Sequence, residues 1–452
     1  MLDNALELLY YHLTHDVYHA HRRDRGFDMQ QSLIIDGGLP LRGELRVNPA
    51  KNAALPILVG SLLTREPITL EEVPRLRDIE VLLELLAHLG TRYAWEGRTL
   101  HLHTPEIQST RAPYELVSKM RASFIVLGAL LAREGEGEVS MPGGCAFGPR
   151  PVDLHIKALR DLGIEIQEEN GTFTARRNGW PEGEVVFDRP TVGGTEQVML
   201  AAALGPTEVT IVNAALEPEI VDFANFLRML GVQIEGAGTA KMTIRGAEAL
   251  GGGSYKIIPD RIEAGTYLLA VAATRGEVLL EGANPEHMDA LLSKLKNAGH
   301  TVLTGTDWVR LKSAREPEPF DVDAREYPGF PTDLQPPVTA YLATVPGVSL
   351  VRDLVYPDRF THVGELARLG AELHLKERVL AIHGRNLTGA RIKAFDIRGG
   401  GAMVIAALAA EGETVLEGMQ HIRRGYEDLE DRLRQLGAVV YDEPVRLEQA
   451  AD

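Results

Sequence analysis

The chain of 452 residues repeats one pattern six times, and this repeat limits the folds that it can adopt. In each copy an amphipathic segment ends in a glycine and is followed by an alternating strand, a turn and a second strand. The six glycines lie 67 to 73 residues apart, at Gly90, Gly163, Gly231, Gly299, Gly370 and Gly437. Glycine suits the C-terminal end of a helix, because a left-handed backbone there costs it no steric penalty. A period of about 70 residues is too long for a solenoid, so it predicts six small α/β units, three in each of two domains.

Two further kinds of segment refine this prediction. The segments 53–59 and 125–131 are apolar all round, which is typical of helices that are buried on every side. We therefore expect such helices at the centre of each domain and the amphipathic helices outside them. The pair Asn170-Gly171 predicts a tight hairpin turn between two strands.

Composition and charge exclude several classes of protein. The hydrophobic share of 44% and the charged share of 25% are typical of a soluble globular chain. A net charge of −17 argues against a nucleic-acid partner or an anionic membrane surface. We find no apolar run that would span a bilayer and no secretory signal, and the single cysteine excludes an intrachain disulfide. These features favour a cytoplasmic protein; they make no prediction of its oligomeric state.

The single cysteine, Cys145, lies in a run of glycines and prolines that predicts a loop. Arg150, Asp153 and His155 follow it closely. Such a polar cluster favours an ionised thiol or binds an anion, whereas the alternative is an incidental cysteine on a loop.

Six segments together connect the chain to a known family. They are NPAKNAALPIL (48–58), KMRAS (119–123), PGGCAFGPRPVDLH (142–155), PDRIEAGTY (259–267), YPGFPTDLQ (327–335) and HIRRGYEDLEDRLRQLGA (421–438). With these segments in this order, the chain resembles the UDP-N-acetylglucosamine 1-carboxyvinyltransferase family of enolpyruvyl transferases. The resemblance covers about residues 33–440. The resemblance implies a two-domain inside-out α/β barrel of six βαβαββ repeats, with helices buried and sheets outside.

The resemblance also implies a division of the chain. Residues 1–32 form an N-terminal extension of unassigned role. Residues 51–258 form the first domain, which carries the Cys145 loop as a lid, while residues 33–50 and 259–445 form the second. Both substrates would bind in the cleft between the domains.

The implied reaction transfers the enolpyruvyl group of phosphoenolpyruvate to the 3-hydroxyl of UDP-N-acetylglucosamine. It releases phosphate through a tetrahedral ketal by addition and elimination, and it is the first committed step of peptidoglycan synthesis. These two small molecules are the implied partners, and no metal or other cofactor is implied. Such chemistry needs cations for the phosphate and carboxylate, an acid at C3 of phosphoenolpyruvate, and a base for the sugar hydroxyl.

Three residues match the catalytic positions of the family. Cys145 matches the cysteine that protonates C3 or chiefly assists product release, and that epoxide inhibitors such as fosfomycin alkylate. Asp333 matches the residue that takes the proton of the sugar 3-hydroxyl, although its sequence context also suits a helix N-cap. Lys51 stands at the start of an apolar helix, where the helix dipole disfavours a lysine that has no functional partner.

The substrate-binding positions follow from the same match. For phosphoenolpyruvate they are Lys51, Asn52, Arg121, Arg150, Arg359, Arg398 and Arg424. For UDP-N-acetylglucosamine they are Asn52, Arg121, Arg150, Pro151, Val152, Asp153, Leu154, His155, Thr191, Val192, Gly193, Asp333 and Val355. Arg121 lies within an apolar segment that reads as a helix, and Arg398 precedes three glycines at a helix start that suits an anion. For each arginine the alternative is an exposed surface charge.

Two other functions stay open at this point. A 5-enolpyruvylshikimate-3-phosphate synthase shares the fold and the arginines but lacks the cysteine loop. A non-catalytic paralogue would bind the UDP-sugar and regulate, but Cys145, Asp333 and Lys51 are all present. The chain departs from the family pattern at Pro149, Thr191, Pro357-Asp358 and Arg423, and none of these changes removes a catalytic group.

Overall fold

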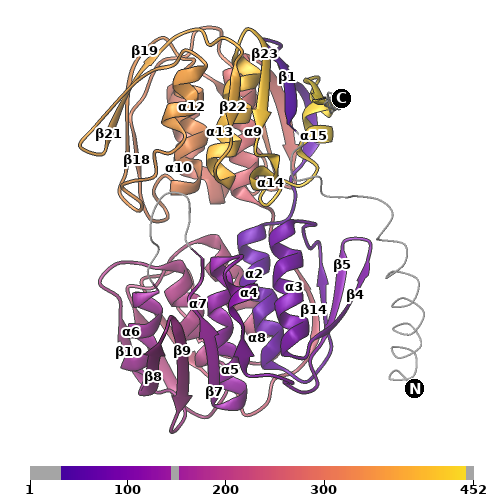
Figure 1. Cartoon of the computed structure of the whole chain (residues 1–452), viewed down its shortest axis with the longest axis vertical. Coiled ribbons are helices and arrows are strands. Elements are labelled where there is room, and N and C mark those ends of the chain that lie inside the picture. The colour runs from indigo at the N-terminus through magenta and orange to yellow at the C-terminus, as the bar shows by residue number, and fades with distance from the viewer. Residues whose placement is uncertain (1–31, 144–151, 444–452) are drawn as a thin grey trace, which may run out of the picture.

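The computed structural model describes residues 32–143 and 152–443 (Figure 1). Cys145, Arg150 and Pro151 lie outside these ranges, as do residues 1–31 and the last two residues of the predicted second domain, 444–445.

Twenty-four strands form six four-stranded sheets of one topology in the described residues. Three sheets have the strand orders β14(Gly253–Lys256)-β3(Ile68–Glu71)-β5(Thr99–His103)-β4(Arg92–Glu96), β6(Arg111–Ala112)-β7(Glu136–Ser140)-β9(Thr172–Arg177)-β8(Ile164–Glu169) and β10(Gly183–Val186)-β11(Glu208–Val212)-β13(Lys241–Arg245)-β12(Gln233–Glu235). The other three are β2(Arg42–Arg46)-β15(Glu277–Glu281)-β17(Trp308–Lys312)-β16(Thr301–Thr304), β18(Val322–Ala324)-β19(Gly347–Asp353)-β21(Val379–Gly384)-β20(Glu372–Lys376) and β22(Arg391–Lys393)-β23(Gly412–Glu417)-β1(Leu33–Gly37)-β24(Val439–Asp442). In every sheet the first pair is parallel and the other two are antiparallel. The sixfold repeat predicted from the sequence is confirmed.

Six helices lie inside these sheets, and nearly all of their residues are buried. They are α2(Lys51–Gly60), α5(Val126–Glu134), α7(Val192–Ala201), α9(Arg261–Ala273), α11(Gln335–Leu342) and α13(Ile397–Ala409). The last three pack against one another, and α5 packs against both α2 and α7. The apolar segment 53–59 falls in α2, and the segment 125–131 falls in α5 apart from Ile125, which precedes it, so the prediction of buried helices is confirmed.

Six amphipathic helices complete the units, and each is followed by one of the repeat glycines. They are α3(Arg77–Leu89), α6(Asp153–Asp161), α8(Pro218–Leu230), α10(Asp289–Asn297), α12(Val363–Arg368) and α15(Leu429–Gln435). Two short helices lie within units: α4(Tyr114–Val117) follows β6, and α14(Met419–Ile422) follows β23. All six glycines have a left-handed backbone, with φ between 77° and 118°, as predicted. Asn170 and Gly171, with φ of 52° and 75°, form the predicted hairpin turn between β8 and β9.

The buried apolar residues form two clusters, which are the two halves of Figure 1. One cluster contains residues between 50 and 257, and the other contains residues 33–47 and 262–440. The N-terminal strand β1 therefore lies beside β23, near the end of the chain, in the upper half (Figure 1). The two connecting segments run side by side, because Ala50 N donates to Ile258 O at 2.8 Å and Asp260 N donates to Asn48 O at 2.8 Å.

Glu196 is a carboxyl group inside the apolar helix α7, with 7% of its surface exposed. Burial, followed by the negative charges of Glu219 and Glu217, raises the pKa of Glu196 from 4.5 to about 8. The folded chain thus keeps a proton that an unfolded glutamate loses near pH 4.5. The contribution of Glu196 to the free energy of unfolding therefore falls as the pH rises from about 4.5 to about 8.

We predict that Glu196→Gln stabilises the chain at pH 8 and changes little at pH 5. Because glutamine stays neutral, the Tm of the variant should exceed that of the parent by at least about 2 °C at pH 8. Thermal unfolding followed by circular dichroism at both pH values measures this difference. Glu184→Gln, at an exposed position of β10, is the control and should show no such pH-dependent gain.

Candidate functional site

Several residues predicted for the site lie at the N-terminal ends of inner helices. Lys51 is the first residue of α2, and Thr191 caps α7, where its side chain accepts from Gly194 N at 3.3 Å. Arg121 opens a 3-10 helix, η2(Arg121–Ile125), that leads into α5. Because the N-terminal end of a helix carries partial positive charge, these ends favour anions.

The three inner helices of the other half begin in the same way. Asp260 caps α9 by accepting from Ile262 N at 2.8 Å, and Arg398 is the second residue of α13. Asp333 lies in the 3-10 helix η4(Thr332–Leu334), which runs directly into α11. The two halves meet here, because Lys51 N donates to the carboxylate of Asp260 at 3.4 Å.

Asp333 is held between two buried arginines. Its Oδ1 accepts from Arg359 Nη1 at 2.9 Å and its Oδ2 accepts from Arg398 Nε at 3.0 Å. The arginine side chains are only 4% and 3% exposed, so they are not the surface charges that we had kept as the alternative. The N-cap interpretation of Asp333 is wrong, because Pro331 caps η4 and the Asp333 side chain faces the arginines.

The charges around Asp333 control its protonation. Burial alone raises the pKa of a carboxyl group, but the positive charges of Arg398 and Arg359 outweigh burial and hold the pKa of Asp333 far below its usual range. The charge of Lys51 adds to this effect from the other half of the molecule. Asp333 is therefore a carboxylate at any physiological pH, and while both arginines hold it, it is a weak base.

A second layer of hydrogen bonds fixes this group. Arg359 Nη1 also donates to Thr332 Oγ1 at 3.0 Å, and the Thr332 hydroxyl donates to Asp353 Oδ2 at 2.6 Å. The other oxygen of Asp353 accepts from Val355 N at 3.0 Å. Val355, which the resemblance implies as a sugar-nucleotide contact, is thus joined to the Asp333 cluster through its backbone.

Asp78 joins Lys51 to Arg424 across the two halves. This residue lies in the first turn of α3, and its side chain is 4% exposed. Its Oδ2 accepts from Lys51 Nζ at 3.1 Å, while its Oδ1 accepts from Arg424 Nε at 2.7 Å. Burial raises the pKa of Asp78, but Lys51 and Arg424 together lower it below its usual value. The sequence analysis missed Asp78, since an acidic residue in the first turn of an amphipathic helix is explained by the helix dipole alone.

Two further ion pairs connect the halves beside this site. Arg98, in the turn between β4 and β5, makes a bidentate pair with Glu427, with both N–O distances at 3.0 Å. Arg261 pairs with Glu219 at 2.9 and 3.2 Å, and both side chains are at least nine-tenths buried. The facing surfaces of the two halves are therefore joined by charge pairs.

The sequence predicted that Arg121 lies within a helix, but the structure places it at the start of the 3-10 helix η2. Met120 has an extended backbone (φ −154°, ψ 129°), so the helical segment starts only at Arg121. The charge of Arg121 acts on His155, whose pKa is lowered to about 4, mainly by burial. His155 is neutral and packs against Gly193 of α7, where a Cβ would come within 2.7 Å of the imidazole ring.

The remaining predicted contacts of the sugar nucleotide lie on two neighbouring elements. Val152 and Asp153 start α6, which packs against α7, and His155 Nδ1 lies 3.4 Å from Gln197 Oε1 of α7. The other predicted contacts on these two elements are Leu154 in α6 and Thr191 and Val192 at the start of α7, whereas Asn52 lies on α2. The structure thus places the α6 and α7 starts together in the first half, whereas Asp333 lies in the second.

Three departures from the family pattern have an explanation in the structure. Arg423 turns toward α15 and pairs with Glu430 at 2.7 Å, whereas Arg424 faces Asp78. Asp358 is exposed and pairs with Arg378 at 3.2 Å. Thr191 caps α7 with its hydroxyl, a role that the more usual serine would also fill.

Comparison with known proteins gives the family. Residues 35–433 match the family described as EPSP synthase (3-phosphoshikimate 1-carboxyvinyltransferase). The chain is 67% identical over 422 residues to a UDP-N-acetylglucosamine 1-carboxyvinyltransferase of Thermus thermophilus, covering 93% of this chain and 99% of that protein. It belongs to the UDP-N-acetylglucosamine 1-carboxyvinyltransferase family. A relative of that name from Deinococcus radiodurans is 53% identical over 416 residues, covering 91% of this chain and 98% of the relative.

Solved structures of other carboxyvinyl-type transferases share the fold. The enolpyruvyl transferase NikO from Streptomyces tendae superposes with a TM-score of 0.82 at 24% identity, covering 92% of this chain and all of NikO. EPSP synthase from Acinetobacter baumannii gives a TM-score of 0.70 at 17% identity over the same shares. The inside-out α/β barrel expected from the resemblance is confirmed. As a UDP-N-acetylglucosamine 1-carboxyvinyltransferase family member, the chain is a transferase, and none of its described helices is long and apolar enough to cross a membrane.

We predict that Asp78→Asn destabilises the chain by about 3 kcal/mol, because it leaves the buried Lys51 without a carboxylate. The measurement is the shift of the urea unfolding midpoint at neutral pH. Glu80→Gln is a matched control two residues away on α3, since Glu80 pairs with Arg77 at the surface with both side chains nearly half exposed. The control should change stability by less than about 0.5 kcal/mol. Equal losses in both variants would contradict a structural role for the Asp78 bridge.

Proposed function

We propose that the chain transfers the enolpyruvyl group of phosphoenolpyruvate to the 3-hydroxyl of UDP-N-acetylglucosamine and releases phosphate. This is the first committed step of peptidoglycan synthesis, and we assign it to the cytoplasm. The observation that carries the proposal is the Asp333 carboxylate, which is 27% exposed and is held between the buried side chains of Arg359 and Arg398. The high identity to relatives of that name supports it.

The reaction proceeds by addition and elimination. The sugar 3-hydroxyl oxygen forms a bond to C2 of phosphoenolpyruvate, and Asp333 takes the hydroxyl proton. Cys145 donates a proton to C3, which gives the tetrahedral ketal. The bond from C2 to the phosphate oxygen then breaks, a proton leaves C3, and phosphate and the vinyl ether are the products.

The charge pairs of the site explain how substrates activate Asp333. Phosphoenolpyruvate brings a phosphate and a carboxylate, and both pair well with guanidinium groups. Arg398 Nη1 is buried without a hydrogen-bond partner among the described residues, so it has a donor ready for an anion. When Arg359 or Arg398 turns to the substrate, the pKa of Asp333 rises toward its usual value, and the carboxylate becomes a better base.

We assign the other contacts by the family pattern. Lys51, Asn52, Arg121, Arg150, Arg359, Arg398 and Arg424 bind phosphoenolpyruvate. Asn52, Arg121, Arg150, Pro151, Val152, Asp153, Leu154, His155, Thr191, Val192, Gly193, Asp333 and Val355 bind UDP-N-acetylglucosamine. Residues 51–258 and residues 33–50 with 259–445 are the two domains in this proposal, and the substrates lie in the cleft between them under the Cys145 lid.

The first test is phosphate release from phosphoenolpyruvate with one acceptor at a time. We expect release with UDP-N-acetylglucosamine and none with shikimate 3-phosphate. Release with shikimate 3-phosphate alone would assign the chain to the sister reaction. Binding of the UDP-sugar without release from either acceptor would instead indicate a regulatory protein.

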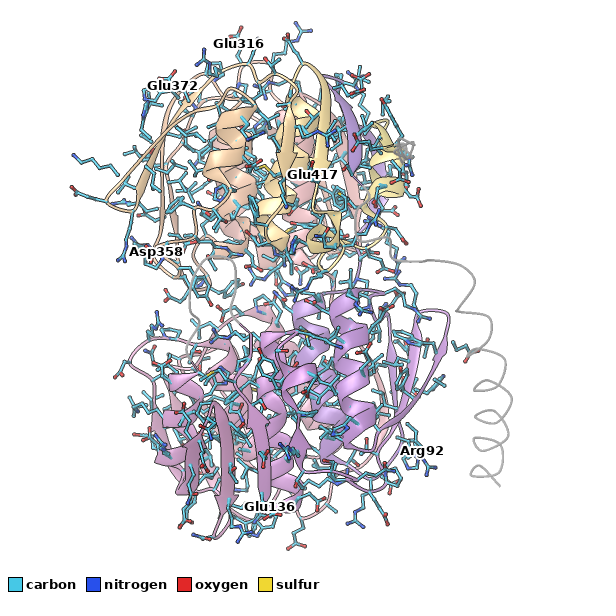
Figure 2. The ribbon with its side chains drawn as sticks, viewed as in Figure 1. Arg92, Glu136, Glu316, Asp358, Glu372 and Glu417 are labelled. Carbon is cyan, nitrogen blue, oxygen red and sulfur yellow. The ribbon has the colours of Figure 1, made fainter. Side chains whose placement is uncertain are left out.

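We predict that Asp333→Asn binds both substrates but lowers kcat by about 10²- to 10⁴-fold, the usual contribution of a general base. Steady-state phosphate release gives kcat, and calorimetry with UDP-N-acetylglucosamine measures binding. The matched control is Asp358→Asn, an exposed aspartate next to Arg359 that is labelled in Figure 2. It should keep the parent kcat. A normal kcat in Asp333→Asn would remove Asp333 as the base.

A further inference from the structure

Three side chains on the outer surface of the second half form a group with metal-ligand chemistry. Glu372 and His374 lie two residues apart on β20, so they point to the same face of the sheet. His383 on β21 is the direct cross-strand partner of Glu372. The ladder between β20 and β21 therefore fixes the positions of all three. Figure 2 labels Glu372 at the outer rim of the half that contains β19 and β21, on the side away from the other half.

The distances in this group approach those of a metal site. Glu372 Oε1 lies 3.7 Å from His374 Nε2 and 4.0 Å from His383 Nδ1, and all three ligand atoms lie within 4.8 Å of one another. In a tetrahedral zinc site, with bonds of about 2.1 Å, neighbouring ligand atoms are about 3.4 Å apart. Small side-chain rotations would close the difference. The three side chains are 43% to 65% exposed, so they have room to make these rotations.

The two oxygens of Glu372 have different partners. Oε1 faces both histidines, whereas Oε2 lies 3.4 Å from Arg385 Nη1. An outer partner of this kind orients a ligating carboxylate and leaves its other oxygen directed at the metal. The two imidazole rings lie edge to face with their centroids 5.6 Å apart, so the group is already ordered around Oε1.

We propose that Glu372, His374 and His383 bind one divalent transition-metal ion, with Zn²⁺ as the natural candidate. Two imidazoles and one carboxylate suit Zn²⁺ better than Mg²⁺ or Ca²⁺, which prefer oxygen ligands alone. Water fills the remaining coordination position. Because β20 is the edge strand of its sheet, the ion links that edge to β21. The site takes no part in the transfer reaction.

The chain contains a comparison pair that lacks the third ligand. His101 and His103 are also two residues apart on one strand, β5, and His101 Nε2 lies 3.5 Å from Glu96. However, His103 Nε2 lies 3.1 Å from the backbone oxygen of Arg65 instead. In the described residues only the Glu372 group brings three such ligand atoms together.

The test measures zinc bound per full-length chain by equilibrium dialysis against ZnCl₂ after removal of metal with a chelator. The background protein carries asparagine in place of four histidines of the N-terminal segment, which would otherwise add zinc of their own: His12, His15, His19 and His21. In this background we expect His374→Ala/His383→Ala to lose one equivalent of bound zinc. We expect Glu372→Gln to weaken zinc binding by at least about tenfold, the loss that even an outer partner causes.

The matched control is His101→Ala/His103→Ala, which should bind as much zinc as the background protein. Zinc should raise the Tm of the background protein and of this control, but not of His374→Ala/His383→Ala. Equal zinc binding in the background protein and in His374→Ala/His383→Ala would overturn the proposal. The side chains of His101, His103, Glu372, His374 and His383 are all partly exposed, so the variants at these positions should fold, and unchanged phosphate release would verify this independently.

Discussion

The structure depends on one constraint, which is the burial of six apolar helices inside six sheets. A helix whose sides are all buried can present polar groups only at its ends. In this chain the N-terminal ends of all six inner helices carry the polar residues of the candidate site, from Lys51 on α2 to Arg398 on α13. The repeat therefore builds the site directly, because each βαβαββ unit contributes one positive helix end. The candidate site lies at these helix ends.

The charges at this surface are arranged as exchangeable pairs. Asp333 pairs with two buried arginines, and Asp78 pairs with a lysine and an arginine that come from opposite halves. Without such partners, burying these cations would cost several kcal/mol for each ion. An anionic substrate can take the place of one carboxylate and release it. The same arrangement thus stabilises these buried charges and prepares a base for the proposed reaction, and it joins the two halves through Arg424.

The sequence predicted the architecture well because the relevant signals are periodic and local. The left-handed glycines, the hairpin at Asn170-Gly171 and the apolar segments each follow from short-range physics, and the structure confirms them. The site was less predictable from residues alone. Lys51, Arg359 and Arg398 look like surface charges until the fold buries them, and Asp78 looks like an ordinary first-turn acid. Arg121 was misplaced because the extended backbone of Met120 interrupts an otherwise continuous apolar segment. The sequence shows which kinds of side chain are available for a site, whereas contacts between residues far apart in the chain decide which of them are brought together.

The position of β1 has a consequence for the order in which the chain can fold. Its two neighbours in the sheet are β23 and β24, so Leu33 pairs with Leu416 and Asp442. On the ribosome, β1 emerges first but has no partner until almost the whole chain has been made. The cluster between residues 50 and 257 is continuous in sequence and can form as soon as it has emerged. The half that holds β1 must therefore be completed last. The two facing surfaces with their charge pairs therefore come together only when synthesis is nearly complete.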